Sequence, residues 1–192
     1  MSVFRRVLGL DAPASDGLPF DPHAPLPATP AGETASVRRI EARLTSLPPA
    51  RARFVAAFAY LLGRAANADL RVTDAEAAEM TRIVAEVGGL DATATALVVD
   101  LARSQAARFG ATEDYLVTRE FKAISTMEDR ERLLRCCLLV MAVDDEVDAT
   151  EAWLVNRIAE ELDIERPALN RIRAEFHDKL SGVREVRRLA GH

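Results

Sequence analysis

The sequence predicts an all-α fold of about seven to eight helices, and three observations point to this class. Apolar residues recur at intervals of three and four from residue 37 onward, which is the period of an amphipathic helix. The strict alternation of apolar and polar residues that is typical of a half-buried strand does not appear. Capping residues and glycines also divide the sequence into pieces of helix length. At 192 residues and 49% hydrophobic, the chain can bury one good core.

The N-terminal residues 1–36 are expected to lie outside this helical domain, which we place at residues 37–180 with a frayed tail at 181–192. Residues 11–32 carry six of the nine prolines, so we expect an extended or disordered linker there. The first ten residues, MSVFRRVLGL, form either a frayed end or a short amphipathic turn that makes a weak contact with a membrane or partner. The frayed end is the favoured interpretation, because chain termini are usually poorly ordered.

The first helices are predicted from stripes of apolar residues and from helix-capping residues. A short helix is expected at residues 37–47, and a longer one begins near Pro49 with an apolar stripe on one face. Thr73 and Glu76 have the spacing of a capping box, so the next helix begins there and ends at Gly88.

The later helices rest on similar signals, and one of them contains both cysteines. Cys136 and Cys137 are adjacent, which makes a poor structural disulfide, so we expect a reduced and buried pair rather than a soft-metal site. Caps and proline positions place the remaining helices at residues 91–110, 112–125, 128–143, from Asp148 and from Pro167.

The pattern D-x-x-V-x-x-x-E occurs twice, 75 residues apart. It pairs Asp69 with Asp144 and Glu76 with Glu151. Each copy reads as a helix hairpin with two carboxylates at its corner. The sequence therefore predicts an internal pseudo-twofold duplication, in which residues 55–87 superpose on 130–162.

These four acids lie on stripes that otherwise face the core, where an ionised carboxylate needs a partner. Capping accounts for the two glutamates, because a carboxylate suits the positive end of a helix. The two aspartates lie at C-terminal helix ends, where negative charge is disfavoured. Two interpretations stay open at this point: ordinary capping and turn chemistry, or a site for a divalent cation or another polar partner, with the repeated Arg82 and Arg157 as candidate partners.

The doubled motif resembles the TerB domain of tellurite resistance proteins, whose fold is also similar to the N-terminal domain of the DjlA co-chaperone. The resemblance covers roughly residues 51–180. It implies an all-helical, pseudo-twofold domain, tied to stress and toxic-oxyanion resistance, whose acids gather around a divalent metal such as calcium, magnesium or manganese. Leu70 and Asp145 stand where the family usually has glycine, so the turn geometry departs from the family pattern. The implied metal ligands are Asp69, Glu76, Asp144 and Glu151.

Other site chemistries are not supported by the sequence. The stretch from Asp144 lacks the glycine and the final glutamate of a calcium-binding EF-hand loop, since Ala149 and Val155 stand there. The three histidines are scattered, and no glycine-rich phosphate loop is present, so we do not expect an enzyme. The net charge of −5 does not favour nucleic acid. No apolar run is long enough to span a bilayer, and we expect a cytoplasmic protein.

The leading functional hypothesis is a non-enzymatic, TerB-like stress-response protein with an acidic divalent-metal site and another protein of a stress-response complex as its partner. The alternative is a protein–protein interaction or co-chaperone-like module in which the same acids are only structural caps. Trp153, the only tryptophan, falls beside the apolar stripe of its helix and is expected to be partly buried.

Overall fold

The computed structural model describes residues 7–8, 35–66, 73–104, 111–142 and 149–176. Every long element in these ranges is a helix and none is a strand, which confirms the all-α class. The predicted linker at residues 11–32 and the tail at 181–192 lie outside the described residues. The helices are α2 (Ala35–Thr45), α3 (Pro49–Ala66), α4 (Asp74–Val87), α5 (Ala92–Ser104), α6 (Ala111–Ile124), α7 (Met127–Met141), α8 (Ala149–Glu161) and a further helix at 166–176.

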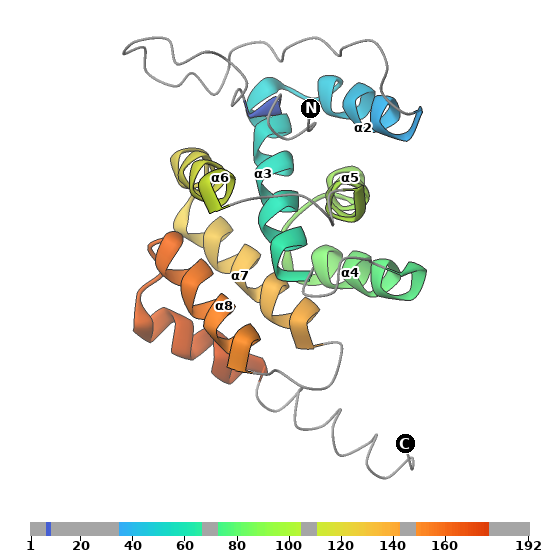
Figure 1. Cartoon of the computed structure of the whole chain (residues 1–192). Coiled ribbons are helices and arrows are strands. Elements are labelled where there is room, and N and C mark those ends of the chain that lie inside the picture. Colours follow the sequence, from blue (N-terminus) through green and yellow to red (C-terminus); the bar gives the residue numbers. More distant parts are fainter. Residues whose placement is uncertain (1–6, 9–34, 67–72, 105–110, 143–148, 177–192) are drawn as a thin grey trace, which may run out of the picture.

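Helix α3 is the centre of the fold. It packs against α5, α6 and α7, while α4 lies against α5 and α7, and α8 lies against α7 (Figure 1). Most α3 side chains are buried, which is expected of a helix that is apolar nearly all round. Gly63 faces α5, and a Cβ atom at this position would lie 3.4 Å from Cα of Ala102, in van der Waals contact with that helix.

One hydrophobic cluster joins all these helices. Phe58 and Phe121 are fully buried, with ring centroids 6.3 Å apart in an edge-on arrangement, and Phe54 lies 5.4 Å from Phe121. Edge-on aromatic pairs are favourable beyond the area that they bury. The rings fix α6 onto the first half of α3.

Two residues of the N-terminal segment depart from the favoured expectation of a frayed end. Val7 and Leu8 are only 5% and 2% exposed, and both belong to the core cluster. Burial stabilises a large apolar side chain by about 1.5–3 kcal/mol, which offsets the conformational entropy lost in ordering the residue. These two side chains are therefore not available for the membrane contact that the sequence had left open.

The observed helix ends follow the predicted caps. The Thr73 hydroxyl accepts a hydrogen bond from the Glu76 amide (3.2 Å), and the Glu76 carboxylate accepts one from the Thr73 amide (2.5 Å). Helix α4 ends at Val87 before Gly88, and Gly89 has a φ of 66°, a conformation that favours glycine. The Asp91 carboxylate accepts from the Ala94 amide and caps α5.

Candidate functional site

The structure describes the four predicted metal ligands unequally. Asp69 and Asp144 lie outside the described residues, and Glu151 belongs to α8 but its side chain is not among those described. Glu76 is the one acid whose contacts are known, and it closes the capping box of α4. Among the described residues, no three His, Cys, Asp or Glu side chains are grouped to hold a metal ion. Whether the four acids converge therefore stays a prediction.

Arg82 does not serve the corner glutamate of its own copy. Arg82 contacts Glu79 and Glu86, one helical turn to either side, and makes no contact with Glu76. Arg157 likewise pairs with Glu161, four residues further on, at 2.9 Å. The repeat therefore preserves an arginine–glutamate pair at spacing i, i+4 in both copies, a spacing that places both side chains on the same helix face.

The second copy uses this pair to join three helices. Arg64 of α3 donates two hydrogen bonds to the Glu161 carboxylate, at 2.6 and 3.1 Å, and its Nε lies 3.4 Å from Asp114 of α6. The Tyr60 hydroxyl donates to Asp114 at 2.8 Å, and the Thr118 hydroxyl donates to Glu161 at 3.3 Å. We call this set, with Arg157, the ion-pair network.

Burial makes the ion-pair network strong. The side chains of Arg64, Asp114 and Glu161 are only 12%, 20% and 23% exposed. Burial alone would raise the pKa of Glu161, but hydrogen bonds from Arg64 and Arg157 hold it below its ordinary value. Burial would also lower the pKa of Arg64, but the bonds to Glu161 and the charge of Asp114 raise it. Both groups are therefore charged at neutral pH.

The network was not predicted, because its members are far apart in the sequence. Arg64 and Glu161 are separated by 97 residues. One signal was present: the position equivalent to Arg64 in the second copy is Leu139, so the arginine interrupts the repeat in the apolar second half of its helix.

The two cysteines lie beside the crossing of α3 and α7. Both are free and buried, as expected, and the Cys137 sulfur lies 3.9 Å from the carbonyl oxygen of Leu61. Burial raises the pKa of Cys136 to about 12, and burial likewise raises that of Cys137. Thiols in this state hold their protons and are poor nucleophiles and poor metal ligands.

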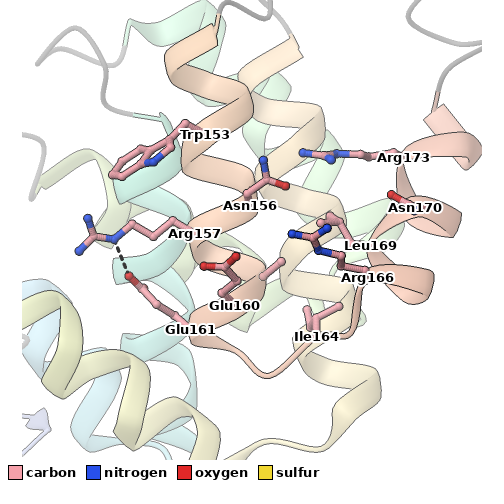
Figure 2. A pocket seen from close by; sticks show the side chains of 11 residues that line it. Trp153, Asn156, Arg157, Glu160, Glu161, Ile164, Arg166, Leu169, Asn170 and Arg173 are labelled. Carbon is pink, nitrogen blue, oxygen red and sulfur yellow. Dashed lines mark hydrogen bonds and ion pairs between the residues drawn. The ribbon is translucent and has the colours of Figure 1, made fainter.

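A groove of about 730 Å³ opens between α8 and the helix at 166–176. Figure 2 shows its polar side chains, with Arg157 reaching Glu161, so the groove borders the ion-pair network. Trp153 lies at one end of this groove and is 56% exposed, more than the sequence had suggested. The Arg157 guanidinium lies over the Trp153 ring, 5.2 Å from the ring centroid, in a cation–π arrangement.

The described residues thus define an all-helical protein whose polar chemistry lies in helix corners, a buried ion-pair network and a surface groove. Comparison with known families gives the particular group: the family model of the tellurite resistance protein TerB matches residues 55–174, more than half of the chain. The chain belongs to the TerB family. No curated protein and no solved structure matches it. None of the described helices is long and apolar enough to cross a membrane.

Proposed function

We propose that this protein is a non-enzymatic, cytoplasmic member of the tellurite-resistance stress response that binds a divalent cation between its two acidic corners. The family assignment supports the tellurite-resistance class. The cation site rests on Asp69, Glu76, Asp144 and Glu151, the acids that the sequence doubles. A protein of a stress-response complex is the proposed partner.

The observation that supports the cation site is the crossing of α3 and α7. Cys137 contacts Leu61, and position 137 is equivalent to position 62 in the first copy. Nearly equivalent positions therefore touch each other, as expected beside a twofold axis. Helix α3 continues for five residues past Leu61, and α7 for four residues past Cys137. At about 1.5 Å per residue, each helix ends within roughly 8 Å of the crossing, immediately before its acidic corner.

Four carboxylates at such a junction repel one another. At an effective dielectric constant near 20, two charges about 4 Å apart cost on the order of 4 kcal/mol. A hard cation such as calcium, magnesium or manganese relieves this repulsion, because carboxylate oxygens are its preferred ligands. The cation binds the folded state alone and so stabilises it, by about 2.7 kcal/mol at a concentration of 100 Kd.

The test is the melting temperature of the purified protein with and without millimolar calcium, magnesium or manganese. We expect a rise in the wild type, and we expect Asp144→Asn and Asp69→Asn to abolish the rise while keeping or raising the cation-free value. Asp74→Asn is the matched control, since Asp74 adjoins the first corner but its side chain is 97% exposed and pairs with Arg103. It should leave the cation response intact.

A melting temperature that stays the same with calcium, magnesium and manganese would overturn the cation site. The second candidate function would then apply, that of an interaction or co-chaperone-like module whose corner acids are caps. The capping box of Glu76 favours this second candidate, because it gives one acid a structural role without any metal.

A further inference from the structure

The groove between α8 and the helix at 166–176 places an exposed aromatic ring beside an apolar hollow. The ring is that of Trp153, the only tryptophan of the chain, which lies exposed at one end of the groove. The groove has a volume of about 730 Å³, larger than one indole ring, and its apolar floor consists of Ala159, Ile164 and Leu169. One face of the molecule therefore carries both a protruding apolar group and a space that fits such a group.

The charges on this face balance. Arg157 is paired with Glu161, and Arg173 also has an interaction partner, so neither arginine contributes a free charge. The other charged side chains that line the groove are Arg166, which is positive, and Glu160, which is negative. Neither of these two forms an ion pair with a residue that the structure describes, and Figure 2 draws no contact between them. A partner segment of a single charge sign is therefore not favoured.

The balanced charges can instead pair with a rotated copy of the same face. Glu160 lies on α8 and Arg166 on the 166–176 helix, on the two sides of the groove (Figure 2). In a twofold arrangement the cation of each copy meets the anion of the other copy. Asn156 and Asn170 also line the groove and are exposed, and an amide group carries both donors and an acceptor, so it can bond its own counterpart. The face is complementary to itself in charge and in hydrogen bonding.

We propose that this face joins two copies of the chain around a twofold axis. Trp153 of each copy enters the groove of the other copy, and Arg166 of each copy pairs with Glu160 of the other. Tryptophan is among the residues that most often dominate the energy of protein–protein interfaces, and complementary charges fix the register of the two surfaces. None of these residues is one of the four corner acids, so the dimer does not rest on the cation site.

Sedimentation velocity of the wild type over a concentration series measures the association. We expect the mass to approach twice the chain mass of 21.0 kDa as the concentration rises into the high micromolar range. Trp153 emission should shift to shorter wavelength over the same series, because the indole moves from solvent to an apolar floor. The buffer contains EDTA, which removes divalent cations and so separates this result from the cation test.

Charge reversal locates the interface. Arg166→Glu and Glu160→Arg each bring like charges together in the dimer, and each is expected to weaken association on the order of ten-fold or more. Arg166 lies in the first turn of its helix and Glu160 in the last turn of α8, so each substitution suits the helix dipole and should fold. Arg39→Glu is the matched control, because Arg39 is an exposed arginine of α2, at the other end of the molecule from α8 (Figure 1). It should dimerise as the wild type does.

A mixture of the two variants distinguishes a contact between copies from a contact within one copy. Arg166→Glu supplies only acids at the two positions and Glu160→Arg supplies only cations. An equimolar mixture should therefore form a heterodimer that associates on the order of ten-fold more tightly than either variant alone. A pair formed within one chain would not be restored by mixing. Trp153→Ala, which changes no charge, should also weaken association of the wild-type face.

Three results would overturn the proposal. The first is a wild type that stays monomeric at several hundred micromolar, and the face would then be open to a different occupant. The second is an equal loss of association in Arg39→Glu and Arg166→Glu, which would show an effect of net charge alone. The third is a mixture of Arg166→Glu and Glu160→Arg that associates no more tightly than the separate variants.

Discussion

At the scale of single residues, Glu161 connects three helices through one carboxylate. Its carboxylate accepts hydrogen bonds from α3, α6 and its own helix through Arg64, Thr118 and Arg157. Its repeat equivalent, Glu86, pairs with Arg82 of its own helix and is 54% exposed. The same arginine–glutamate pattern therefore contributes differently to stability in the two copies, because the glutamate of the second copy is partly buried against α3 and that of the first copy is exposed.

Glu161→Gln is expected to lower the free energy of unfolding by about 2–3 kcal/mol at pH 7, because the buried Arg64 loses the carboxylate that accepts its two hydrogen bonds and keeps only Asp114 as a charge partner. Glu86→Gln, the matched control, should cost under about 0.5 kcal/mol.

The native pKa of Glu161 is lowered, so the contribution of Glu161 to stability is present above the ordinary pKa of 4.5 and is lost as pH falls through the native pKa. The difference between wild type and Glu161→Gln should therefore shrink below about pH 4. Urea unfolding at several pH values measures this, and a constant difference would contradict it.

At the scale of helices, local chemistry was enough to predict most boundaries. Thr73 with Glu76 and Gly88 with Gly89 gave both ends of α4, and α7 begins at Met127, one residue from the expected start. Such signals act within four residues of the chain, which is why a single sequence reveals them. Helix α6 also begins within one residue of its predicted start.

Thr73→Ala is expected to cost about 1 kcal/mol in the absence of added cation, because the Glu76 amide loses its acceptor at the start of α4. Thr81→Ala in the same helix is the control. Thr81 is exposed and its hydroxyl bonds only a backbone carbonyl of its own helix, so alanine there should be neutral or mildly stabilising. The denaturant midpoints of the two variants measure the stability lost in each. Equal midpoint shifts for both threonine variants would show that the capping box does not stabilise the protein.

At the scale of the whole molecule, the contacts that place the helices against one another were not predictable. Leu61 meets Cys137 across 76 residues, and Arg64 meets Glu161 across 97. No periodicity within one helix specifies its distant partner, so the candidate site could be predicted as a list of acids but not as a geometry. The ion-pair network and the groove required the packed structure.

Val7 and Leu8 belong to the same hydrophobic cluster of described residues as Phe176, at the other end of the described chain. Leu8→Ala should therefore lower the stability of the whole protein by about 2–3 kcal/mol, through lost apolar burial and an unfilled space. Met127→Ala is the control, because Met127 is 47% exposed, and it should cost well under 1 kcal/mol.

One cluster also implies one unfolding transition. Thiol labelling of Cys136 and Cys137, which are buried in α7, and far-UV dichroism should therefore give the same denaturant midpoint in the wild type, and Leu8→Ala should shift both midpoints equally. The described segment 7–8 lies beside the start of α3 (Figure 1), whereas the cysteines lie in α7 where it crosses α3, so a shift in thiol exposure shows that the contact made by Leu8 stabilises the distant core. If Leu8→Ala leaves the thiol midpoint unchanged, the N-terminal residues are not a part of the cooperative core.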